Sequence, residues 1–191
     1  MQRRLHADHG YDVAMFSYPS ITGTMAEHVT SLRAFAQAQN CERMHFVGHS
    51  LGGIVILKML EAGDDFPQGR VVCLGSPLQG SVVVESFARL PFGRAALGAA
   101  IREEVLARKS RQWRGAREVG VIAGSSSIGM GRLFADFQEA NDGTVLVSET
   151  QLAGAKDHVV MPVSHSGMVF SADVTKQIAG FLRQGAFTAA A

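Results

Sequence analysis

Short apolar runs alternate with helical patterns along most of this 191-residue chain, and this alternation limits the fold more than any other feature of the sequence. Runs of four to six apolar residues are typical of strands, whereas apolar residues spaced three and four apart indicate helices. The runs predict strands at residues 13–16, 43–47, 71–74, 119–123 and 158–163. The helical patterns cover residues 24–39, 50–62 and 172–184. Strands separated by helices pair in parallel, so we predict an α/β fold with a mostly parallel sheet flanked by helices.

The segment 76–117 interrupts this alternation between two predicted strands. Its first half is apolar, and its second half, at residues 101–113, is predicted to be a basic helix. No repeat, linker or low-complexity block divides the sequence, so we predict a single domain over residues 1–191 with a cap-like excursion at 76–117. An excursion that packs onto the core explains the same apolar pattern equally well.

Composition excludes several classes of protein. The formal net charge is +1 with scattered basic residues, which argues against a nucleic-acid partner. No apolar run approaches the ~18 residues of a membrane span, and no hydrophobic stretch follows the basic residues at the N-terminus, so we expect a cytoplasmic protein from the sequence as written. Cys41 and Cys73 are expected to be free thiols, a single disulfide being the alternative; nothing has metal-ligand spacing, and we expect neither metal nor cofactor.

Residues 48–52 read Gly-His-Ser-Leu-Gly, between a predicted strand and an apolar helix. A nucleophilic serine requires such a turn, because its strained backbone exposes the hydroxyl and small neighbours let strand and helix approach. We therefore predict that Ser50 is a nucleophile and that the amide of Leu51, at the start of the helix, faces the oxyanion that forms on attack. The alternative is an ordinary turn in which Ser50 only caps the helix.

A serine nucleophile needs a base, and the base needs a carboxylate to orient it. We predict His165 as the base, because it follows the last strand, at the edge of the sheet where ligands bind; His158 begins that strand at the opposite end. Asp142, 23 residues earlier in a turn-forming Asn-Asp-Gly sequence, is the predicted acid. An Asx turn that only caps backbone amides is the alternative for Asp142, and Asp136 and Glu139 are competing carboxylates.

Three stretches resemble the α/β-hydrolase superfamily, and within it the bacterial lipases and esterases. They are residues 47–53; residues 75–81, similar to the Gly-Thr-Pro-x-x-Gly-Ser segment common in lipases; and residues 141–145 with 163–167. The likeness spans about residues 11–184, and the superfamily has the same chain order of serine, acid and histidine. By this resemblance Ser50, Asp142 and His165 are nucleophile, acid and base of a serine hydrolase that cleaves carboxylic esters.

The same resemblance implies that the apolar half of the excursion lines an acyl-chain site for a medium-chain ester or lipid. Its candidate substrate-binding residues are Val83, Phe87, Leu90 and Phe92. An acyltransferase or thioesterase with the same triad, and a non-catalytic binding module of the same fold, remain alternatives.

The resemblance breaks at the N-terminus. The family's second oxyanion donor follows an earlier strand and often lies beside a His-Gly pair, but His9-Gly10 precedes a predicted strand here. Residues 1–7 read as the end of an amphipathic helix that began upstream. We therefore expect an N-terminally shortened hydrolase fold, weakly active because one such donor is worth about 3 kcal/mol. Its open sheet edge is expected to recruit a partner, a second copy being one candidate.

Overall fold

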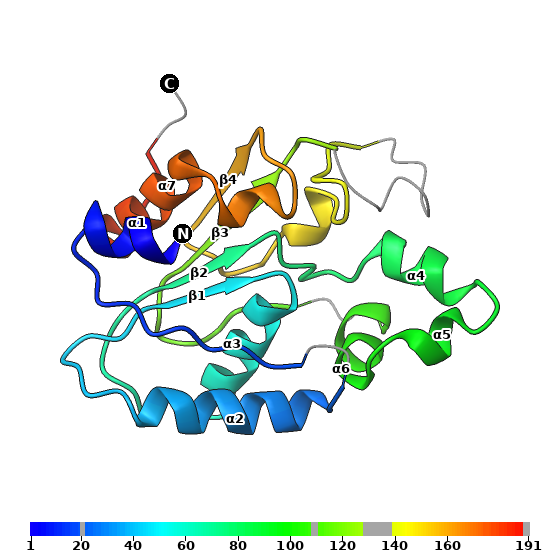
Figure 1. Ribbon diagram of the computed structural model, residues 1–191, viewed down its shortest axis with the longest axis horizontal. Coiled ribbons are helices and arrows are strands. Elements are labelled where there is room, and N and C mark those ends of the chain that lie inside the picture. The colour runs from blue at the N-terminus through cyan, green and yellow to red at the C-terminus, as the bar shows by residue number, and fades with distance from the viewer. Residues whose placement is uncertain (20–21, 108–110, 128–138, 189–191) are drawn as a thin grey trace.

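The computed structural model describes residues 1–19, 22–107, 111–127 and 139–188. A parallel sheet with the strand order β1-β2-β3-β4 lies at its centre (Figure 1). The strands are β1 Phe46–His49, β2 Val71–Leu74, β3 Val119–Gly124 and β4 Asp157–Met161. Neighbouring parallel strands need connections that cross a face of the sheet, and helices cover both faces. The predicted α/β fold is confirmed.

Successive side chains of β2 and β3 point to opposite faces and divide the core in two. The side chains that join the cluster of α2 (Met25–Gln37) and α3 (Leu51–Glu61) are Val71, Cys73, Val119 and Val121. Those that join the cluster of α1 (Gln2–Ala7) and α7 (Ala172–Gln184) are Val72, Leu74 and Ile122. Figure 1 shows α1 and α7 above the sheet and α2 and α3 below it. Burial on both faces explains why the strand sequences are continuously apolar.

The two long outer helices begin at the side chains that their sequences provide. Thr24 accepts a hydrogen bond from the Glu27 amide, while the Glu27 carboxylate accepts one from the Thr24 amide, which together form a capping box. At the start of α7 the Ser171 side chain accepts a hydrogen bond from the Val174 amide, and Gly185 ends the helix in a left-handed conformation with φ of 76°. Because these signals are local, the predicted α7 is correct at both ends and α2 is correct to within two residues.

The strand predicted at residues 13–16 is wrong. Residues 11–19 have no regular secondary structure, and within the described part of the chain no backbone hydrogen bond joins them to β1. Tyr11, Val13, Phe16 and Tyr18 nevertheless pack against the two core clusters. The apolar side chains of this segment therefore reflect burial, whereas a strand also needs a neighbouring strand with which to pair. β1 is an edge strand in this sheet, and recruitment of a second copy there stays a prediction.

The excursion leaves the sheet after β2 and returns at β3. It forms α4 (Val82–Ala88), α5 (Gly93–Ala96), α6 (Ala99–Ile101) and a π-helical turn, η1 (Arg102–Leu106). The basic helix predicted over 101–113 is correct only as far as η1. Residues 108–110 lie outside the described part, and 111–113 are not helical, because the Trp113 amide donates to the Ala153 carbonyl at 2.7 Å and its indole donates to the Arg117 carbonyl. Two short 3₁₀ turns, η3 (Ser148–Thr150) and η4 (Gly167–Val169), flank β4.

Gly53 lets α3 pack closely against the chain that follows β2, and this contact generates a test of the fold. A Cβ atom at position 53 would lie 2.2 Å from Ser76 Oγ and 3.2 Å from Cys73 Sγ, both fully buried. Gly53→Ala should therefore lower the free energy of unfolding by about 1–3 kcal/mol. Gly52→Ala is the matched control, because its Cβ meets only the Tyr18 hydroxyl at 3.9 Å. It should leave stability unchanged or raise it, since alanine favours helix. Equal denaturation midpoints for the two variants would contradict this packing.

Candidate active site

Ser50 occupies a strained turn between β1 and α3. Its φ of 54° and ψ of −126° lie in a region that residues other than glycine rarely adopt. The turn is held by a hydrogen bond of 2.8 Å from the Ser50 amide to the Leu74 carbonyl. Gly48 permits the close return of the chain, because a Cβ atom there would lie 2.6 Å from the backbone of Gly52 and Gly53. The sequence prediction of a strained strand-to-helix turn at this serine is confirmed.

Leu51 is the first residue of α3, so its amide lies at the positive end of the helix dipole. Amides in a first helical turn have no partner inside their own helix. Within the described residues, the Leu51 amide donates to no acceptor. It is therefore available to an anion held next to Ser50.

Asp142 and His165 form a buried pair. Asp142 Oδ2 lies 2.7 Å from His165 Nδ1, and the Asp142 side chain is 1 % exposed. The other carboxylate oxygen, Oδ1, accepts hydrogen bonds from the amides of Thr144 and Val145 at 2.9 and 2.7 Å. An ionised carboxylate only accepts, so Nδ1 carries the proton and Nε2 is left free to accept one. The Asx turn and the orientation of the histidine therefore use different oxygens of one carboxylate.

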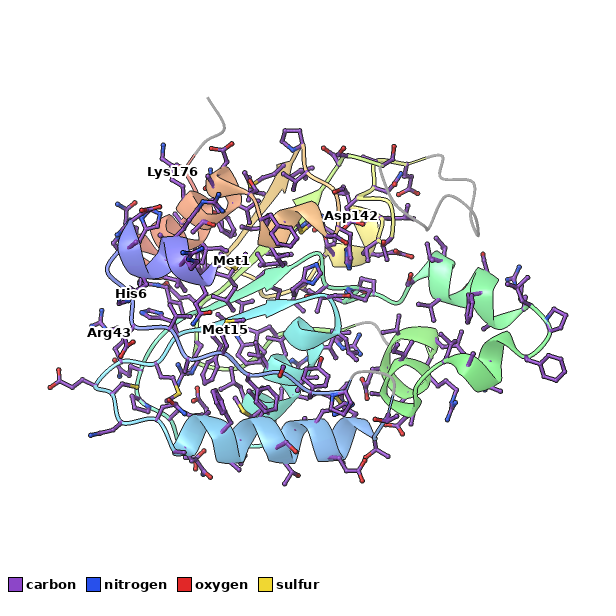
Figure 2. All side chains as sticks on the ribbon, viewed as in Figure 1. Met1, His6, Met15, Arg43, Asp142 and Lys176 are labelled. Atoms are coloured by element: carbon purple, nitrogen blue, oxygen red, sulfur yellow. The ribbon has the colours of Figure 1, made fainter. Side chains whose placement is uncertain are left out.

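The pair lies over the carboxyl ends of β1 and β2. A Cβ atom at Gly75, the residue after β2, would lie 3.0 Å from Asp142 Oδ2 and 3.1 Å from His165 Nδ1. Leu74, just before it, pairs in register with His49, the neighbour of Ser50. Figure 2 shows Asp142 at this end of the molecule and Arg43, which precedes β1, at the other. The nucleophile, base and acid predicted from the sequence thus lie at the same end of the sheet.

Ser50 Oγ and His165 Nε2 are not hydrogen-bonded to each other among the described residues. Bonds between a nucleophile and its base are often long in the absence of substrate and shorten when it binds. The structure therefore holds the acid and the base against each other, and Ser50 follows β1 at the same end of the sheet.

His49 contacts His165 in a way that sequence reasoning missed. Its Nε2 lies 2.9 Å from the His165 carbonyl oxygen, and the two ring centroids are 4.5 Å apart. Because a carbonyl only accepts, Nε2 must donate. Burial, and then the nearby His165, lower the pKa of His49 to about 4, so the ring is neutral at pH 7. His49 thereby ties the loop of the base to the strand that leads to Ser50. In the sequence, the one signal for this contact was the position of His49 directly before Ser50.

The competing candidates lie elsewhere or have other partners. His158, at the start of β4, has its Nε2 2.9 Å from Thr150 Oγ1. The Glu139 carboxylate accepts a hydrogen bond from Ser148 Oγ. Asp136 lies outside the described residues. Of the carboxylates whose contacts are described, Asp142 is the one that holds His165.

The predicted substrate-binding residues all lie on the first part of the excursion. Val83 and Phe87 are half-buried on α4. Leu90 and Phe92 are exposed in the connection between α4 and α5. Whether these side chains line an acyl site stays a prediction.

A family model described as the alpha/beta hydrolase family matches residues 2–180 of the chain. No curated protein sequence shows a significant match.

Solved structures similar to this chain include bacterial lipases and esterases. The mature lipase BlEst2 from Bacillus licheniformis has a TM-score of 0.58 at 18% identity, over 84% of this chain and 74% of that one. The metagenomic carboxyl esterase MGS0156 has a TM-score of 0.56 at 20% identity, over 74% of this chain but 51% of its own length. Phospholipase PlaB from Legionella pneumophila has a TM-score of 0.55 at 15% identity, over 71% and 35%. At these identities the likeness shows a shared fold.

The two functions of Asp142 can be separated by substitution. Asp142→Asn keeps an Oδ1 acceptor for the Thr144 and Val145 amides, so its melting temperature should stay close to that of the parent. Asp142→Ala leaves both amides without that acceptor, and each such loss in a buried site costs about 1–3 kcal/mol. Thermal unfolding by circular dichroism measures the difference. Equal melting temperatures for the Asn and Ala variants would show that the turn does not depend on this carboxylate.

Proposed function

Because the chain belongs to the α/β-hydrolase family, we propose that it is a serine hydrolase that cleaves carboxylic esters through an acyl-enzyme on Ser50. The observation that carries the proposal is the 2.7 Å contact of buried Asp142 with His165 Nδ1, at the sheet end where Ser50 is strained. A serine that only capped α3 would need no oriented imidazole near it. Its side chain also makes no capping hydrogen bond.

In the proposed mechanism His165 Nε2 removes the proton from Ser50 Oγ as the oxygen attacks the ester carbonyl. The negative charge that develops on the carbonyl oxygen accepts a hydrogen bond from the Leu51 amide. Asp142 stabilises the imidazolium of His165, which then protonates the leaving alcohol. Water attacks the acyl-enzyme with the same histidine as base, and Ser50 is regenerated.

The proposed substrate is a small ester with an apolar acyl chain. The similar structures include proteins named as a lipase, a carboxyl esterase and a phospholipase, which favours an ester over other acyl compounds. Val83 and Phe87, half-buried on α4, are the proposed contacts for the acyl chain. The mechanism uses only side chains and amides of this chain and needs no cofactor.

Replacement of the nucleophile or the base tests this proposal. Ser50→Ala and His165→Ala should each lower kcat for p-nitrophenyl butyrate by about 10⁴-fold or more, because neither group has a substitute. His158→Ala is the control, since its ring contacts Thr150, and it should retain most of the activity. Steady-state rates and circular dichroism spectra of all three are compared with the parent. An active Ser50→Ala protein, or an inactive, folded His158→Ala protein beside an active His165→Ala, would overturn the assignment.

The contact between His49 and His165 predicts a smaller effect. His49→Phe keeps a ring but loses the donor to the His165 carbonyl, a hydrogen bond worth about 1–1.5 kcal/mol, so kcat should fall about tenfold. His49→Gln places an amide N–H2 where the imidazole Nε2 lies and should restore part of the loss. Unchanged values of kcat in both variants would show that His49 does not position the base.

A further inference from the structure

The connection between α4 and α5 exposes consecutive apolar residues. Phe92 is 88% exposed, more than any other large hydrophobic side chain of the described residues. Leu90 is 45% exposed, and Pro91 between them is exposed as well. Figure 1 shows this connection projecting from the body of the molecule, on the side toward which the strands point. The most exposed apolar group thus extends beyond the end of the sheet that carries Ser50.

The backbone holds Phe92 outward. Its φ of 63° and ψ of −1° are left-handed, a conformation that favours glycine or asparagine. The turn is fixed by a hydrogen bond of 2.9 Å from the Gly93 amide to the Leu90 carbonyl. A Cβ atom at Gly93 would lie 2.0 Å from the Phe87 carbonyl oxygen, so α5 starts directly against α4. An exposed phenylalanine in a strained, tightly packed turn points to a use for its side chain.

Charge is distributed unevenly around this tip. The excursion, residues 76–117, contains eight basic and three acidic residues, a net charge of +5, whereas the rest of the chain contains ten and fourteen, a net charge of −4. Some of these basic groups are paired internally: Arg111 with Glu104, and Arg117 with Asp64. The net positive charge of the excursion therefore favours an anionic ligand only where exposed basic side chains have no internal partner.

Arg89 and Arg94 flank the exposed apolar residues. Both are exposed, and neither side chain has an ion-pair partner within the described residues. The nearest acidic residue in the sequence is Glu85, one helical turn before Arg89. Residues 89–94, hereafter the tip, thus combine two apolar side chains with two cations that are available to an external anion.

We propose that the tip docks the protein onto an anionic lipid surface. Phe92 and Leu90 enter the boundary between head groups and acyl chains, where an apolar side chain leaves water, and Arg89 and Arg94 bind lipid phosphates. A protein partner would need a stable contact of about 800 Å² per side, which a turn of six residues does not offer alone. A second copy bound tip to tip is disfavoured, because Arg89 and Arg94 of the two copies would repel each other.

Docking here would turn the Ser50 end of the sheet toward the lipid, since the tip projects on that side (Figure 1). The inference does not rest on ester hydrolysis, because binding needs only the tip. A Ser50→Ala protein should therefore bind lipid as the parent does. Failure of the binding test and failure of the hydrolysis test are thus separate results.

Co-sedimentation with vesicles tests the inference. In this experiment the Ser50→Ala protein is the parent into which every other substitution is introduced. The parent should bind vesicles of phosphatidylcholine mixed with phosphatidylglycerol, bind phosphatidylcholine alone weakly, and release as salt is raised. Phe92→Asn should weaken binding about tenfold, because asparagine accepts the left-handed turn but cannot enter the apolar layer. The double variant Arg89→Glu, Arg94→Glu should abolish the preference for the anionic lipid. Leu90→Ser provides a second apolar variant should Phe92→Asn fold poorly.

Phe170→Asn is the matched control. Phe170 is 73% exposed but follows η4, outside the excursion, so its replacement should not change binding. The inference is overturned if the parent binds neither kind of vesicle, or if Phe92→Asn and Leu90→Ser bind as the parent does. It is also overturned if Phe170→Asn weakens binding equally, or if the parent self-associates on gel filtration and Phe92→Asn abolishes that association instead.

Discussion

The parallel pairing of four strands in chain order places the carboxyl ends of all four at the same edge of the sheet. Ser50 follows β1, Gly75 follows β2, and His165 lies in the loop after β4. Residues more than a hundred positions apart therefore lie at one end of the molecule without any dedicated connection between them. The helices on both faces exclude water from the sheet, so polar functional groups lie in the loops beyond the carboxyl ends of the strands.

Within that frame, polar contacts between loops define the site. Asp142 uses one oxygen to fix its own turn and the other to orient His165, so the turn and the base are held by the same carboxylate. The His165 amide donates to the Asp142 carbonyl at 2.8 Å, and its carbonyl accepts from His49. The base is thus held on both sides, by the acid's turn and by the strand of the nucleophile. These contacts fix the orientation of the ring through Nδ1 and the backbone, and Nε2 makes no hydrogen bond within the described residues.

Most of the fold could be predicted from the sequence because its signals are local. The apolar run at residues 71–74 and the helix at 172–184 coincide with β2 and α7, and the glycines around Ser50 predicted its turn. The prediction failed where structure depends on distant partners. Residues 13–16 form an apolar run typical of a strand but pair with no strand within the described residues, and 111–113 are not helical because Trp113 bonds with Ala153.

The candidate site shows the same division. Ser50, Asp142 and His165 could be chosen from motif context and chain order, and the structure brings the last two into contact. The bond of His49 spans 116 positions, so no local pattern announces it. The exposure of Phe92 was equally hidden, because an apolar residue in an apolar segment reads as buried until its turn is known. Local motifs can be predicted from the sequence, whereas exposure and long-range contacts depend on the complete fold.

The central claim is that His165 activates Ser50. A fluorophosphonate probe reacts with serines whose hydroxyl is activated, and mass spectrometry of peptides then identifies the modified residue. The account predicts one adduct, on Ser50, and a labelling rate in folded His165→Ala that falls about a thousandfold, as expected when a serine loses its base. Labelling of a different serine, or an equal rate on Ser50 in the His165→Ala protein, would contradict it.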